Sequence, residues 1–217
     1  MGQKASPKSL RIKINETWSS SWFNDKNFGS QLVEDIKIRQ EILKKLKGGL
    51  ISKVLIDRDA NQTTVSIYTA RPGVLIGRSG SGSEKIKEMI EKMISKKIRL
   101  NIIEVKKSEI NASIIAQNIA AQLEKRFPFR RALKQAIENS KEEGVKGIKI
   151  QVSGRLNGAD IARSEKASYG SVPLSTLKSE IDYFHTTALT TYGIIGIKVW
   201  VYLGKSSMSV DYKDKVK

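Results

Sequence analysis

The chain has 217 residues, and its 39 lysines and arginines outnumber its 22 aspartates and glutamates, which gives a formal net charge of +17. It has no cysteine and one histidine, so disulfide bonds, a thiol nucleophile and cysteine-based zinc sites are excluded. No apolar run approaches the roughly 20 residues that span a bilayer, and we expect a soluble intracellular protein without a cofactor or a small-molecule substrate. A folded chain with this charge is expected to bind a polyanion, and nucleic acid fits better than a membrane surface.

Residues 1–28 combine cations with aromatic side chains and are predicted to form a basic, extended arm that ends in an apolar anchor. The cations that we expect to contact phosphates are Lys4, Lys8, Arg11 and Lys13. The aromatic residues are Trp18, Trp22, Phe23 and Phe28. They could stack on bases, but hydrophobic anchoring of the arm is the favoured interpretation.

The next segment changes from helical to strand periodicity and back. Apolar residues recur at helical spacing over 32–46, with Leu32, Val33, Ile36, Ile42, Leu43 and Leu46 as members, until glycines end the helix. Alternation then predicts a hairpin over 54–67, which Pro72 terminates. A short apolar turn, a helix from about Ser83 and a strand at 98–102 complete the order α-β-β-α-α-β.

The second half predicts two helices packed on a sheet. An apolar face over 112–123 indicates a helix that Pro128 ends, and a second helix runs from Phe129 to about Glu143. Strand-like segments follow at 148–152, 163–172, 177–183 and 195–203. The expected fold class is therefore α+β, with the second domain a two-helix layer on a four-stranded, mainly antiparallel sheet.

Two glycines frame the first candidate RNA-binding site, Gly77-Arg78-Ser79-Gly80. A plain glycine turn explains such a motif when it stands alone. Here it joins two short helices inside the α-β-β-α-α-β order, which is the arrangement of a KH domain. Glycine lets an RNA backbone approach closely, and Arg78 supplies charge.

Cations recur at two places in the second domain. Arg130, Arg131, Lys134 and Lys141 fall within roughly one third of the helix circumference. From the residues alone, a solvated basic face and a phosphate-binding face are equally good interpretations. Arg155 and Arg163 lie in a glycine-punctuated connection, where bidentate pairing with rRNA phosphates is the favoured role and a tight turn is the alternative.

Five stretches, MGQK, TARPGVLIGRSG, LEKRFPFRRALKQAI, GIKIQVSGRLNGADIAR and TTYGIIGIKVWVYLG, resemble the bacterial small-subunit ribosomal protein S-three family nearly end to end. The resemblance implies a type-two KH domain and a family-specific carboxy-terminal domain in the head of the small subunit, at the mRNA entrance channel. It implies small-subunit rRNA of the 16S type, mRNA and head proteins ten and fourteen as partners. Cations matching Arg130, Arg131 and Lys134 line that channel in the family and assist unwinding of structured mRNA.

The expected domains are the arm at 1–28, the KH domain at 29–107, the carboxy-terminal domain at 108–205 and a short polar tail at 206–217. Ser79 departs from the family, which usually has a second cation there. No nucleophile with a base and no paired carboxylates are visible, so a nucleic-acid repair enzyme is the weaker alternative and no catalytic residue is expected. A free-standing KH regulator of mRNA is the other alternative, but it would not need the second domain. A cytoplasmic ribosome is the expected location, with an organellar ribosome as its alternative.

Overall fold

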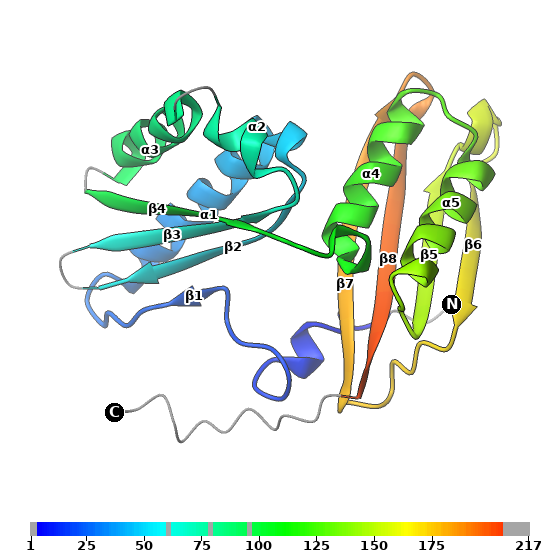
Figure 1. Cartoon of the computed structure of the whole chain (residues 1–217), viewed down its shortest axis with the longest axis horizontal. Helices are drawn as coiled ribbons and strands as arrows, with labels where there is room; N and C mark the ends of the chain where they lie inside the picture. Colours follow the sequence, from blue (N-terminus) through cyan, green and yellow to red (C-terminus); the bar gives the residue numbers. More distant parts are fainter. Residues whose placement is uncertain (1–3, 60–61, 78–79, 95–96, 206–217) are drawn as a thin grey trace. The chain divides into compact units, whose positions relative to one another are not determined.

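The chain is organised as two compact units (Figure 1). The computed structural model describes residues 4–59, 62–77, 80–94 and 97–205. Residues 18–106 form the first unit, and the remaining residues on either side of it in the sequence form the second unit. Residues 18–28, which the sequence analysis grouped with the arm, lie in the first unit.

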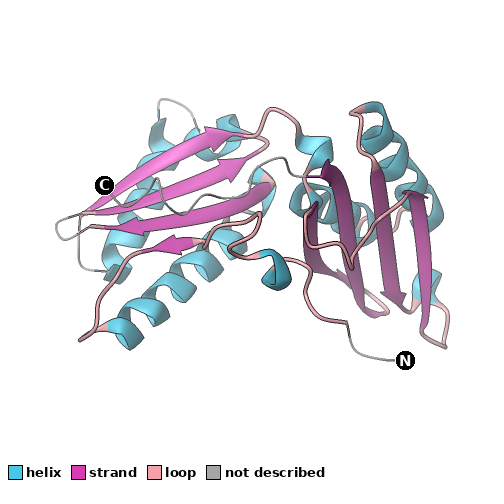
Figure 2. Cartoon of the chain, turned by 90° about the horizontal axis from the view of Figure 1, so that it is seen from below, coloured by secondary structure: helices cyan, strands magenta, loops and turns pink. Residues whose placement is uncertain are grey.

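The first unit is a four-stranded sheet with helices on one face (Figure 2). Its elements in chain order are β1 (Ser20–Ser21), α1 (Phe28–Lys45), β2 (Ile51–Arg58), β3 (Thr63–Thr69), α2 (Pro72–Ile76), α3 (Ser81–Ile94) and β4 (Ile98–Glu104). The strand order is β1-β2-β3-β4, in which β2 and β3 are antiparallel and β1 and β4 pair in parallel with their neighbours. The predicted α-β-β-α-α-β order is confirmed, and β1 is an addition.

Helix α1 packs on the sheet through a narrower face than its apolar residues suggest. Ile38 and Ile42 are fully buried and join the core formed by β2, β3 and α3. The positions Leu32, Val33, Ile36 and Leu43 instead remain between 40% and 49% exposed. The helix is where its periodicity predicts it, but most of its apolar residues point away from the core.

A buried carboxylate ties the start of the first unit to its sheet. Asp35 is fully buried and accepts hydrogen bonds at 2.8 Å from both the Ser20 hydroxyl and the Trp22 indole N–H. On β2, Arg58 donates to the same carboxylate from Nε at 2.9 Å and also pairs with Glu34. Because the carboxylate is surrounded by donors, its charge is compensated without water.

The second unit is a fully antiparallel sheet covered by two helices on one face (Figures 1 and 2). Its helices are α4 (Ala112–Glu124) and α5 (Phe129–Glu142), and its strands are β5 (Gly147–Gly154), β6 (Arg163–Gly170), β7 (Ser179–Thr190) and β8 (Gly193–Lys205). The strand order is β6-β5-β8-β7. The predicted α+β class and the two-helix layer are confirmed. No helix among the described residues is long and apolar enough to cross a bilayer.

The helices bury one face of this sheet, and the other face carries polar residues together with a smaller apolar cluster around Ile181, Trp200 and Tyr202. Ile148, Ile150 and Val152 of β5 are fully buried in one core with the apolar side of α4. Side chains alternate along a strand, so Lys149 and Gln151 lie on the opposite face. Residues 4–17 of the arm belong to this unit as well.

We expect Arg58→Met to destabilise the first unit by about 3 kcal/mol, because it leaves the buried Asp35 charge without its cation. Hydrogen exchange of the amides of β2 and β3 measures this change in the full chain. The matched control is Lys87→Met, which removes an exposed pair with Glu91 on α3 and should change stability by less than about 1 kcal/mol. Equal protection in the two variants would contradict this role of Arg58.

Candidate nucleic-acid interface

The flanks of the glycine loop meet at very short range. A Cβ atom on Gly82 would lie 2.4 Å from the Leu75 carbonyl oxygen, so the first turn of α3 packs directly on the backbone of α2. Gly77 and Gly80 have φ angles of 68° and 84°, in the left-handed region that favours glycine. Arg78 and Ser79, the other two members of the predicted site, lie outside the described residues.

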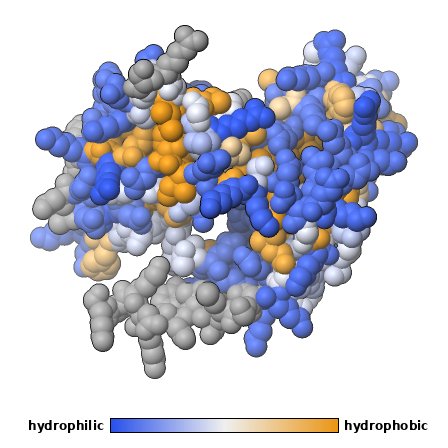
Figure 3. Space-filling view, in the orientation of Figure 1, coloured by the Kyte–Doolittle hydropathy of each residue, from blue (hydrophilic) through white to orange (hydrophobic). Residues whose placement is uncertain are grey.

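Helix α5 presents its cations together on one exposed side. Arg130, Arg131, Lys134 and Lys141 are all exposed, whereas Leu133 on the opposite side is buried. Aromatic rings support three of these cations at 5.3 to 5.7 Å from their centroids: Phe129 under Arg130, Phe127 under Arg131 and Tyr169 under Lys141. Figure 3 shows this helical face of the second unit covered mainly by hydrophilic residues.

Strand β6 extends this cationic side through one shared carboxylate. Glu165 Oε1 lies 3.6 Å from Arg130 NH2 and also 3.6 Å from Arg163 Nε. The two arginine side chains are 74% and 50% exposed, and exposed ion pairs of this kind contribute little to stability. Phosphates can therefore compete for both guanidinium groups. We refer to Arg130, Arg131, Lys134, Lys141 and Arg163 as the α5 basic surface.

Arg155 is largely engaged by its own loop. Its Nε donates to the Ala159 carbonyl at 2.9 Å, its NH2 lies 3.1 Å from Asp160 Oδ1, and its guanidinium lies over the Tyr192 ring at 5.9 Å. The side chain is still partly exposed. The structure thus gives Arg155 a loop-bracing role and keeps it apart from the cluster that Arg163 joins.

The four arm cations divide into anchored and free side chains. Arg11 is only 1% exposed, and it donates to the carbonyl oxygens of Pro7, Leu174, Thr176 and Ser179 at 2.8 to 3.0 Å. Burial lowers the pKa of this guanidinium. Lys8 pairs with Asp182 at 2.9 Å, while Lys4 and Lys13 are exposed. Arg11 therefore anchors the arm and is not presented on the surface.

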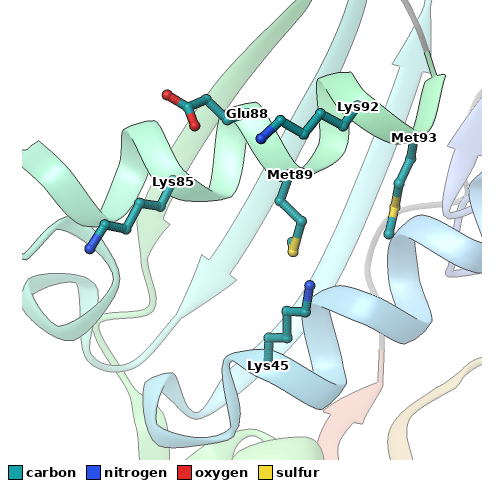
Figure 4. A pocket seen from close by; sticks show the side chains of 6 residues that line it. All are labelled: Lys45, Lys85, Glu88, Met89, Lys92 and Met93. Atoms are coloured by element: carbon teal, nitrogen blue, oxygen red, sulfur yellow. The ribbon is translucent and has the colours of Figure 1, made fainter.

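A groove between α1 and α3 in the first unit has a cationic rim (Figure 4). Its volume is about 430 Å³, and Met89 and Met93 line it together with Lys45, Lys85, Lys92 and Glu88. Lys45 reaches from α1 toward Met89 on α3. A lining with three lysines and one carboxylate suits contact with an anion.

The sequence analysis did not single out the lysines on the open face of the second sheet. Lys149, Lys166 and Lys198 come from three neighbouring strands, and cross-strand register brings them together. The alternation of these lysines with core residues within each strand could have placed them on one face of the sheet. Among the described residues, no cluster of histidine, aspartate and glutamate is placed to hold a metal ion.

Comparison with known families gives two matches along the chain. Residues 37–110 match the KH domain, and residues 119–201 match the family described as ribosomal protein S3, C-terminal domain. Small ribosomal subunit protein uS3 of Desulforamulus reducens is 52% identical over 206 residues, which cover 94% of this chain and 93% of that protein. The uS3 proteins of Ehrlichia canis and Pediococcus pentosaceus are 51% and 47% identical, over 96% and 94% of this chain and 99% and 92% of their own.

Removing the Arg11 anchor should release the arm. We expect Arg11→Met to raise the rate at which proteinase K cleaves residues 4–17 by roughly tenfold or more, because a charged donor to several buried carbonyls is lost at a cost of about 1.5–3 kcal/mol. The control, Lys13→Met, removes an exposed cation from the same arm and should leave the rate unchanged. Unchanged cleavage of Arg11→Met would show that other contacts hold the arm.

Proposed function

The chain belongs to the small ribosomal subunit protein uS3 family, and from this premise we propose that its α5 basic surface lines the channel through which mRNA enters the small subunit. Membership makes the chain a structural component of the small subunit that associates with rRNA through an RNA-binding fold, and not an enzyme. The contact with mRNA and the assistance to its unwinding are the proposed parts.

The observation that carries the proposal is the gathering of five exposed cations on one side of α5 and on the neighbouring strand β6, where Arg130 and Arg163 share the Glu165 carboxylate. Guanidinium and ammonium groups at this density bind phosphates without reading bases, which suits a passage that must accept every message. We propose that the channel admits mRNA as a single strand, so that binding favours the open form of a hairpin by mass action. The aromatic rings beneath three of the cations hold them in place and reduce the entropy lost on contact.

We propose rRNA as the partner of the remaining sites. Gly77 and Gly80 have no side chains that would keep an RNA backbone away from the loop. Arg78 supplies the positive charge of the motif. In the second unit, the proposed rRNA contacts are the exposed Lys4 and Lys13, and to a smaller extent Lys8 and Arg155, because carboxylates already pair with these two. Arg11 acts indirectly by anchoring the arm.

Protein partners are proposed for the exposed side of α1. Phe28, Leu32, Ile36 and Leu43 are 40% to 56% exposed and fall within one narrow arc of the helix. An apolar stripe of this kind on a described surface is typical of an interface. Head proteins ten and fourteen, in a cytoplasmic ribosome, are the partners that we propose.

The test of the α5 basic surface is replacement of Arg130, Arg131 and Lys134 by alanine. We expect slower translation through a stable mRNA hairpin and unchanged speed on an unstructured message, because the phosphate contacts that favour the open strand are lost. The melting temperature should hardly change, since surface substitutions alter stability by about 0.5 kcal/mol or less each.

The control is a second triple alanine variant at Lys37, Lys44 and Lys97, which removes the same charge from exposed positions of the first unit outside the candidate sites. Both variants are compared in sucrose gradients so that only assembled small subunits are assayed. If the α5 variant translates the hairpin as fast as the control variant does, the proposed role in the mRNA channel is wrong.

A further inference from the structure

The open face of the second sheet carries a cavity, and Lys4 is the one residue of its lining that the sites above include. Its volume is about 520 Å³, within the roughly 300–1,000 Å³ of common ligand pockets. Residues 4–7 of the arm form one wall, and the floor comes from β5, β7 and β8. All of these residues belong to the second unit, so the cavity lies within one compact body.

Strand register gathers cations along one row of this face. Gln151 of β5 lies opposite Lys166 on one side and opposite Lys198 on the other. Two inter-strand spacings place the backbones of these lysines about 10 Å apart, so two flexible ammonium groups can reach one anion between them. Lys149 lies two residues before Gln151 and therefore projects from the same face.

Among the residues that the structure describes, no carboxylate lies within ion-pair distance of Lys4, Lys166 or Lys198. Burial lowers the pKa of Lys149, and the positive charges of Lys4 and Lys166 lower it further. An anion bound here would relieve this repulsion, whereas a cation or a neutral ligand would not.

Aromatic rings complete the floor. The Tyr183 and Trp200 rings lie 5.3 Å apart between centroids, tilted by 37°, and Lys149 Nζ sits 5.4 Å from the Trp200 centroid. Burial raises the pKa of the Tyr183 phenol, which therefore stays neutral and can donate a hydrogen bond. Cations beside an aromatic surface are the combination with which proteins bind single-stranded nucleic acid.

We propose that this cavity binds a backbone phosphate of an RNA strand through Lys166 and Lys198, with the neighbouring nucleotide lying against Tyr183. The proposal rests on the RNA-binding role of the family but concerns a surface separate from the α5 basic surface. An acidic protein segment would satisfy the lysines but would leave the aromatic floor unused, so RNA fits the whole lining better. Arg11 contributes to the site indirectly, because it anchors the arm whose residues 4–7 form one wall of the cavity.

The test uses the full chain with Lys166→Glu and Lys198→Glu, and a short unstructured oligouridylate as the probe. Both lysines are exposed, so the fold should persist, which the near-ultraviolet circular dichroism of Tyr183 and Trp200 verifies. At the same salt concentration, we expect the affinity of the variant for the probe to be about tenfold lower than that of the wild type. The slope of log affinity against log salt should become shallower by about 0.7–1.4.

The matched control is the double variant Lys178→Glu, Lys205→Glu, which makes the same charge change at exposed positions of the same unit outside the cavity. It should retain most of the wild-type slope. Ultraviolet cross-linking of the wild-type chain to the oligouridylate should yield peptides that contain Tyr183 or Trp200.

Equal salt slopes for the two double variants, or cross-links confined to other peptides, would overturn the proposal. The same results are expected if an acidic protein and not RNA fills the cavity. This measurement needs no ribosome. Its failure is therefore distinguishable from failure of the proposed mRNA role, which is measured by translation through a hairpin with the cavity intact.

Discussion

Mutual repulsion among the excess cations is the constraint on which the arrangement of this chain depends. A net charge of +17 on 217 residues must be kept at the surface while two separate apolar cores form. Two arginines that lie deep in the units are surrounded by acceptors, Arg11 by backbone carbonyls and Arg58 by Asp35 and Glu34. Much of the remaining excess lies on exposed faces, where a polyanion can neutralise it.

The exposed cations gather at two kinds of site in the second unit, the α5 basic surface and the open face of the sheet. On the α5 basic surface the cations are exposed and held by aromatic rings, so they form the row of charges along which we propose that mRNA moves. On the open face of the second sheet the lysines surround a cavity with a fixed wall, so they suit an RNA segment that stays in place. Phosphate is the ligand in both proposals, and the sites differ in whether the cations lie on an exposed helix or around a cavity.

Periodicity predicted the elements well, because amphipathic helices and alternating strands are local patterns. It could not predict which side of α1 is buried, since Asp35 lies on the core side only because Arg58, Ser20 and Trp22 meet it there. Arg11 looked like a phosphate ligand for a similar reason: its four carbonyl partners come from residues more than 160 positions away or from its own turn. Predicting that the open-face lysines lie together requires the register between strands, which sequence spacing does not give.

The most direct test of the central claim, that the α5 basic surface contacts mRNA, is cross-linking within purified small subunits that contain this chain. A message bearing a photoreactive uridine at successive positions is bound, irradiated and digested, and the cross-linked peptides are identified by mass spectrometry. The account predicts cross-links to the peptides of α5 and of β6 that carry Arg130, Arg131, Lys134 and Arg163. Cross-links that map only to other segments of the chain, from every position of the message, would contradict it.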